Sequence, residues 1–261
     1  MKTTLIFGLL LALGFSVFSS GCSKISMILK GEATLYIVAV ESNEPDAASM
    51  TERAEGVLKN RFSGANIDAE IARTGEKRLE VKIYGGYDRE YVRAFFKTYR
   101  LEFKKAVSPP DPIPVKTYEE LEKAGSAAST GQQVLPYPSE DAGTTMKYLI
   151  VEQEPIITGE DIKTAWTSST SDSDADNRIL FTLSPEGASR FAGWTRANIK
   201  NYLAIVLNDQ VENVVLISSV ISDQGQINGK FTRGEAAAIA MALNSGHLPA
   251  ELTVVEERSL N

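Results

Sequence analysis

The stretch SPEGASRFAGWTRANIKNYLAIVL, residues 184–207, decides the central unit of the fold. Ser184 is a good helix N-cap, because its hydroxyl can accept a hydrogen bond from a free amide of the first turn. Pro185 suits the first helical position, where no donor is needed. Apolar residues then recur at helical spacing, which predicts a helix with one half-apolar face. The short, apolar and partly β-branched run at residues 203–207 predicts a buried strand.

The chain returns from this strand as a second strand. Residues 208–210 predict a turn, and residues 211–217 predict the returning strand, so one helix lies against a small sheet. Both faces of the returning strand carry apolar residues, and one of the two faces must lie under the helix. The other face has no obvious cover, and an uncovered apolar patch marks an interaction site. We place the predicted contact surface at Val214 and Leu216, with cover by the rest of the protein as the alternative.

Composition limits the classes of function. The chain has 261 residues, of which 43% are hydrophobic, and this is enough for one large or two small domains. The formal net charge is −7, and a surface of that sign repels nucleic acid. A single cysteine excludes an internal disulfide and a cysteine metal cluster. We therefore expect neither nucleic acid nor a metal or other cofactor as a partner.

The N-terminus has the pattern of a targeting segment. Lys2 precedes a continuous apolar run over residues 5–18, which is short for a bilayer span and typical of a signal peptide. The run ends in Ser-Ser-Gly-Cys at residues 19–22, which resembles a lipoprotein box, although Ser19 stands where an aliphatic residue is usual. The sequence predicts a lipoprotein-type signal segment over residues 1–22 with Cys22 as the lipidation site. An ordinary signal peptide and a short membrane anchor are the alternatives.

The region after this segment predicts a strand and helix order that defines a fold class. The order is β-α-β-β-α-β, over residues 33–40, 49–62, 66–72, 78–84, 88–98 and 101–107. This is the split βαβ, ferredoxin-like arrangement of an α+β protein. Further along the chain we expect a short helix from Thr158 to Trp166, a surface loop over residues 126–141, and a closing helix and strand over residues 236–244 and 252–256.

Two short motifs resemble known binding motifs, a calcium loop and a PxxP ligand, but we interpret both as ordinary connecting segments. Asp172, Asp174 and Asp176 have the spacing of a calcium loop. Asn177 and Leu183, however, stand where an EF-hand-like loop needs Gly and Glu, so we expect an ordinary loop. The proline-rich run at residues 108–114 contains a PxxP spacing and predicts an extended connector.

No constellation of residues indicates catalysis. The single histidine, His247, precedes Leu248 and Pro249 and is interpreted as a residue of a connecting turn. A Ser-His-Asp pattern, a glycine-rich phosphate loop and a metal-ligand cluster are all absent from the sequence. We therefore predict a protein that is not an enzyme and has no catalytic, cofactor-binding or metal-binding residues.

Several segments together resemble one family, the first periplasmic domain of SecD, the accessory subunit of the bacterial preprotein translocase. Their order along the chain matches that family. The segments lie at residues 58–62, 78–81, 101–103, 157–162, 187–188, 203–208, 227–232, 235–236 and 244–252. The resemblance implies a ferredoxin-like base with an inserted α+β head subdomain. On this basis we expect the base at residues 23–154, with its connector at 108–145, the head at 155–231, and the closing helix and strand of the base at 232–258.

The resemblance also supplies an expected role. It implies a non-catalytic envelope protein that binds exported or unfolded polypeptides, or translocase subunits, and assists protein export. We expect the soluble part of SecD on a lipid anchor, facing the periplasm or the exterior, without the membrane domain that couples export to proton flow. The alternative is a structural or interaction lipoprotein of the envelope with no link to translocation.

Overall fold

The computed structural model describes most of the chain after the N-terminal segment. The described residues are 32–42, 46–107, 113–115, 120, 123, 128–137, 146–169, 177–229 and 231–260. The expected signal segment with Cys22, most of the connector at 108–145, and the residues 172–176 considered for calcium lie outside them. No helix within the described ranges is long and apolar enough to cross a membrane.

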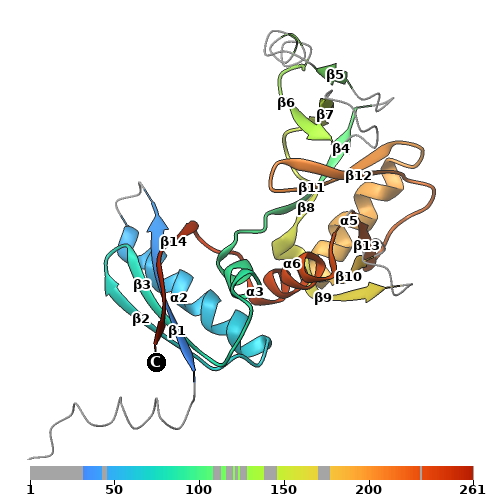
Figure 1. The fold of residues 1–261 in the computed structure, drawn as a ribbon. Coiled ribbons are helices and arrows are strands. Elements are labelled where there is room, and N and C mark those ends of the chain that lie inside the picture. Colours follow the sequence, from blue (N-terminus) through green and yellow to red (C-terminus); the bar gives the residue numbers. More distant parts are fainter. Residues whose placement is uncertain are drawn as a thin grey trace, which may run out of the picture.

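Four antiparallel strands and a long helix form the base (Figure 1). The sheet order is β14-β1-β3-β2, from Glu251–Leu260, Ala33–Glu41, Arg78–Tyr84 and Ala69–Gly75. Helix α2 (Ala47–Gly64) covers one face, where Leu58 and Phe62 are buried against the sheet. The short helix α3 (Arg89–Arg93) and the 3-10 turn η1 (Ala94–Phe96) complete that layer. The α+β class is confirmed.

One strand of the predicted base lies elsewhere. Residues 101–107 were expected as its fourth strand, but β4 (Leu101–Ala106) pairs with β11 (Tyr202–Leu207) in another sheet. The place beside β1 is taken by β14, which begins 145 residues after the end of β4. The physical reason is packing, because Leu101 and Phe103 are buried in a cluster that strands outside the base supply. Alternation of apolar residues predicts a strand but not its sheet.

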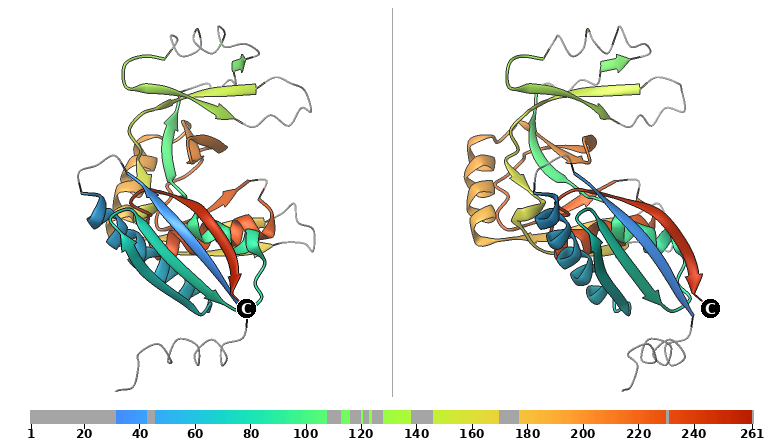
Figure 2. Two further views of the ribbon diagram at one scale, coloured as in Figure 1. Left: turned by 60° about the vertical axis from the view of Figure 1, so that its left-hand side comes forward. Right: turned by 90° about the vertical axis from the view of Figure 1, so that its left-hand side faces the viewer.

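The largest sheet has seven strands and begins at an edge formed by β12 (Gln210–Leu216). The order is β12-β11-β4-β7-β5, with β6 also paired to β7 and β8 to β4. The bounds of the remaining strands are Ile113–Val115 for β5, Gln132–Tyr137 for β6, Met146–Glu152 for β7 and Ile157–Thr158 for β8. The hairpin of β6 and β7 stands at the end of the molecule away from the base (Figure 2). The expected loop at 126–141 is therefore wrong over the residues of β6.

A separate sheet has three strands. Its order is β13-β10-β9, from Gln224–Asn228, Asn177–Leu183 and Ile162–Ser169. The helix expected from Thr158 to Trp166 is wrong, because only the 3-10 turn η2 (Gly159–Asp161) forms before β9 begins. Thr158 does cap that turn, but β9 then pairs along its length with β10. Strand pairing thus ends the helix after one turn.

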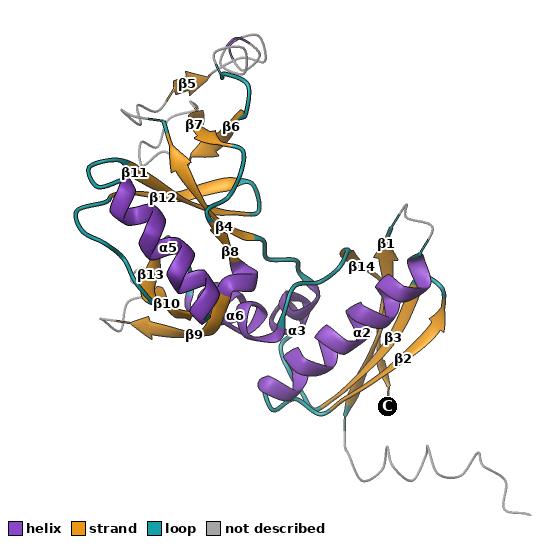
Figure 3. Ribbon diagram, turned by 180° about the vertical axis from the view of Figure 1, so that it is seen from behind, coloured by secondary structure: helices purple, strands orange, loops and turns teal. Residues whose placement is uncertain are grey.

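Two helices pack on these sheets, and their caps agree with the sequence (Figure 3). Helix α5 (Pro185–Ala197) begins after Ser184, whose hydroxyl accepts from the amide of Gly187. Helix α6 (Arg233–Ser245) begins with a capping box between Thr232 and Glu235. The helix expected over residues 49–62 begins two residues earlier, at Ala47, without a side-chain cap.

Helix α6 belongs to the packing of both regions. Its residues Ile239 and Leu243 are buried in the cluster built by β4, β9, β10, β11 and α5. Met241 of the same helix packs against the core of the base. The base and the larger region between β4 and α6 therefore meet along this helix.

Candidate functional site

The predicted contact residues lie on an edge of the large sheet. Strand β12 pairs with β11 and has no second partner among the strands that the structure describes. Its hairpin turn is formed by Asn208 and Asp209, which both have positive φ, of 49° and 63°. Two such residues give a type I′ turn, which matches the twist of the strands it joins. The predicted turn at 208–210 is thus present.

A β-bulge divides β12 into two parts. The register shifts between Ile205 and Val206, so that Asn213 and Val211 face them and Glu212 is the extra residue. Val211 therefore joins Val214 in one apolar cluster. Regular alternation along the strand would place Val211 on the face of Val215, but the bulge reverses the alternation at this point.

The two predicted contact residues differ in exposure. Val214 is half-buried against the cluster of Leu135, Leu149 and Val151, which the hairpin of β6 and β7 supplies. Leu216 has 51% of its surface exposed. The side chains of residues 214 and 216 lie on the same face of the strand, and the face under α5 holds Val215 instead. Leu216 is thus the accessible member of the pair.

Further apolar side chains are exposed close to the end of β12. Ile199 and Val220 have 44% and 38% of their surfaces exposed. The turn after α5 is tied to the end of β12 by two backbone hydrogen bonds, from Lys200 N to Ile217 O at 2.8 Å and from Ile217 N to Asn201 O at 2.9 Å. These bonds hold Ile199 near Leu216. We call Ile199, Leu216 and Val220 the apolar rim.

Glu212, the only ionisable residue of β12, has a carboxyl whose pKa is raised above its ordinary value. Burial raises the pKa of the Glu212 carboxyl, and a hydrogen bond from Gln210 Nε2 to Glu212 Oε1, at 3.0 Å, lowers it by less. The neutral carboxylic acid is therefore favoured more than in water. A half-buried carboxyl of this kind hinders the pairing of another strand with this edge less than an exposed carboxylate would.

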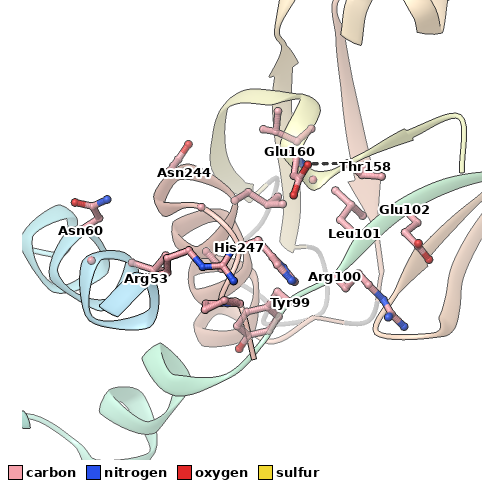
Figure 4. Close-up of a pocket in the computed structure, with 18 residues that line it drawn as sticks. Arg53, Asn60, Tyr99, Arg100, Leu101, Glu102, Thr158, Glu160, Asn244 and His247 are labelled. Carbon is pink, nitrogen blue, oxygen red and sulfur yellow. Dashed lines mark hydrogen bonds between the residues drawn. The ribbon is translucent and has the colours of Figure 1, made fainter. Parts of the chain in front are cut away.

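A second feature is the cleft where the base meets the larger region (Figure 4). It has a volume of about 810 Å³. Arg53 extends from α2 toward His247, which follows α6, and Glu160 lies on the opposite wall. His247 is exposed, as expected for a turn residue. Arg100, at the start of β4, forms an ion pair with Asp209 of the β11–β12 turn.

The cleft shows no arrangement for catalysis. Of its charged lining residues, Arg53, Arg100 and Glu160 are exposed. The half-buried Glu102 forms an ion pair with the buried Lys104 at 3.5 Å. Within the part of the chain that the structure describes, no group of three or more His, Cys, Asp or Glu residues could hold a metal ion. The cleft is interpreted as the space between two packed regions.

Two polar side chains with structural roles escaped the sequence analysis. Arg61 is buried in α2 and donates from Nη1 to Phe95 O at 2.6 Å and to Lys97 O at 2.8 Å. Burial lowers the pKa of its guanidinium to about 10. Its place between Leu58 and Phe62 on an apolar face was the available signal. Asn244 of α6 accepts from Ala165 N at 2.8 Å and donates to Ala165 O at 2.7 Å, and no sequence signal marks this.

Comparison with known proteins gives a consistent result. Residues 132–250 match the family model described as the SecDF P1 head subdomain. A SecD protein translocase subunit of Aquifex aeolicus is 35% identical over 190 residues, covering 72% of this chain and 35% of the relative. A SecD subunit of Elusimicrobium minutum is 30% identical over 240 residues, covering 87% of this chain and 50% of the relative. The chain thus spans half or less of the length of these relatives.

Solved structures show the same fold. A SecDF structure in a super-membrane-facing form aligns with a TM-score of 0.65 at 24% identity, over 87% of this chain and 30% of that one. A second structure, described as a membrane component SecDF that enhances protein export, aligns with a TM-score of 0.59 at 25% identity. It covers 85% of this chain and 98% of that one. The resemblance noted in the sequence is confirmed.

Proposed function

We infer that this chain, which has the sequence of a SecD family member and the fold of the SecDF P1 domain, acts in protein export by holding segments of exported polypeptides. The relatives are protein translocase subunits, and one related structure is described as that of a membrane component that enhances protein export. Binding is the proposed activity, without a chemical step. Polypeptide segments that are still unfolded expose the apolar side chains that a binding surface of this kind recognises.

The observation that carries this proposal is the apolar rim at the end of β12. Ile199, Leu216 and Val220 expose apolar surface that the described residues leave uncovered. Single exposed apolar residues are normal, but these three belong to two short segments that backbone hydrogen bonds join at the end of β12. Val214 is included in the proposed contact surface through its backbone, because its side chain is half-buried.

We propose a place for the protein as well as a role. Attachment through a lipid on Cys22 would hold it at a membrane, facing the periplasm or the exterior. More than one acyl chain is needed for stable anchoring, and a lipidated N-terminal cysteine supplies that. Translocase subunits at the same membrane are the proposed neighbours. No observation favours a structural lipoprotein without a link to export.

We also propose that the larger region is inserted into the base. The base sheet is completed by β14 at the end of the described chain, while β4 leaves it after η1. Residues 96–98 and 247–252 line the same pocket, so the two connections lie close together. The insertion then runs from about residue 98 to residue 246, which is longer than the head expected at 155–231, because β4, β6 and β7 share the large sheet with β11 and β12.

The test uses a fluorescently labelled, urea-unfolded exported precursor diluted into the full chain. Leu216→Asp is expected to weaken binding at least tenfold, because an apolar contact of this size contributes about 1–2 kcal/mol and a buried carboxylate costs more. Val255→Asp is the matched control, since Val255 lies on β14 with 52% of its surface exposed. Equal affinities for the two variants would rule out the rim as the binding site, and no binding by the unmodified chain would rule out the function.

A further inference from the structure

We propose that the bound polypeptide pairs with β12 as an added antiparallel or parallel strand, through the backbone groups of residues 213–216. This inference rests on the proposed function and names how the same surface recognises its partner. The partner is an extended, unfolded segment of another protein. Strand addition takes affinity from main-chain hydrogen bonds and needs side-chain pockets only at alternate positions. It therefore suits a protein that meets many different sequences.

The hydrogen-bond pattern shows which groups of β12 point outward. Asn208 N donates to Arg100 O at 2.9 Å, which makes residues 208, 206, 204 and 202 the ones that bond to β4. The alternate residues Leu203 and Ile205 therefore bond to β12, opposite Val215 and Asn213. The N–H and C=O groups of Val214 and Leu216 consequently point away from β11.

The bonds at the end of the hairpin lead independently to the same assignment. Ile217 N donates to Asn201 O, and Ile217 O accepts from Lys200 N, so the backbone groups of Ile217 face inward. Inward and outward groups alternate along a strand, which again places those of Leu216 and Val214 outward. Among the described strands, β6 packs close to β12, but only β11 is paired with it by backbone hydrogen bonds. An extended peptide offers the complementary row of donors and acceptors.

The other described sheet edges carry features that hinder strand addition. On β9, the side chain of Asn244 occupies both backbone groups of Ala165, in the way that a neighbouring strand would. Prolines, charges and short length are the usual protections of an edge. They occur as Pro114 on β5, Pro136 on β6, Glu70 and Arg73 on β2, Glu251, Glu256, Glu257 and Arg258 on β14, and a length of five residues on β13. Strand β12 has the half-buried Glu212 and the bulge at that residue, so these protections end before residues 213–216.

The bulge and the rim set the extent of the proposed contact. Pairing stops at Glu212, because the bulge there breaks the regular spacing of the edge groups. Leu216 stands at the other end with its side chain exposed, and Ile199 and Val220 lie beyond it. A partner strand can thus pair along residues 213–216 and place an apolar side chain against the rim.

The test removes one outward N–H while the contacts with β11 stay in place. Leu216→Pro deletes the outward donor, and proline is tolerated on an edge whose N–H faces solvent. Leu216→Ser is the matched control, because it removes the same apolar side chain and keeps the donor. With the labelled precursor and the full chain, Leu216→Pro is expected to bind about fivefold more weakly than Leu216→Ser, since one main-chain hydrogen bond of about 1 kcal/mol is lost.

A third variant tests which backbone N–H groups of β12 point toward β11. Val215→Pro removes an inward donor and is expected to lower the unfolding midpoint far more than Leu216→Pro does. If Leu216→Pro and Leu216→Ser bind equally, while the unmodified chain binds the precursor, strand addition is overturned and the proposed function stands. If sedimentation equilibrium instead shows a dimer of this chain that Leu216→Pro abolishes, the edge pairs with a second copy and the proposed partner is wrong.

Discussion

The contact between Asn244 of α6 and Ala165 of β9 offers a sharp test of how this helix is held against the three-stranded sheet. The Asn244 side chain of α6 accepts from Ala165 N at 2.8 Å and donates to Ala165 O at 2.7 Å. Ala165 is buried, so both of its backbone groups lose their partner when the amide is removed. The informative pair of substitutions is Asn244→Ala, which removes both bonds, and Asn244→Asp, which keeps the acceptor and loses the donor.

The magnitudes follow from the two bonds. Each neutral hydrogen bond contributes about 1 kcal/mol net, so Asn244→Ala loses about 2 kcal/mol. Alanine regains about 0.5 kcal/mol through its higher helix propensity, which leaves a net loss of about 1.5 kcal/mol. At neutral pH, Asn244→Asp is expected to lose more, because an ionised carboxylate oxygen would face Ala165 O near the C-terminus of α6, where negative charge is unfavourable.

The pH dependence separates this account from a general loss of packing. The carboxyl introduced by Asn244→Asp can donate to Ala165 O only when protonated, so its pKa in the folded state is raised above the ordinary value of about 3.9. Its contribution to stability is present below that value and is lost as the pH rises through the folded-state pKa. Urea unfolding at pH 4 and pH 7, monitored by tryptophan fluorescence, measures this. If the free energies of unfolding of Asn244→Asp and Asn244→Ala differ by the same amount at both pH values, the introduced carboxyl forms no protonation-dependent hydrogen bond with Ala165 O.

Three further predictions follow from other features of the chain. Glu212→Gln is expected to raise the free energy of unfolding at pH 7 and to leave it unchanged below pH 4. Burial raises the pKa of Glu212, so the stability that its neutral form contributes is lost as the pH rises through that pKa. Urea titrations at both pH values test this, and an equal gain at the two values would contradict it. Cys22→Ala is expected to release the protein from membranes or to leave its signal segment uncleaved, and an unmodified Cys22 found by mass spectrometry in protein from its natural host would show the lipidation proposal to be wrong. Replacing residues 98–246 by a short Gly/Ser linker is expected to leave a base that melts cooperatively, because the connections lie close together and a loop of altered length costs little; a broad, non-cooperative melt would count against the insertion.

Helix caps and turn residues in the sequence determined where helices begin and where two strands form a hairpin. The cap at Ser184 with Pro185 fixed the start of α5, and the positive-φ turn at residues 208–209 joined two strands that were both predicted. The helix expected over residues 236–244 is likewise present as α6, which extends from Arg233 to Ser245. Caps, turns and periodicity act within a few residues, so one sequence is enough to read them.

Only the tertiary structure decided which elements meet. The sequence predicted a strand at residues 101–107, but its sheet depended on β11 and on the cluster around Phe103. Residues 162–169 became a strand because β10 offered a partner, although the capped turn before them favoured a helix. The bulge at Glu212 and the bonds from Asn244 to Ala165 also join residues far apart in the chain or depend on a partner strand. Strand pairing and burial are non-local, so the free edge of β12 could be recognised only after the remaining strands had found their partners.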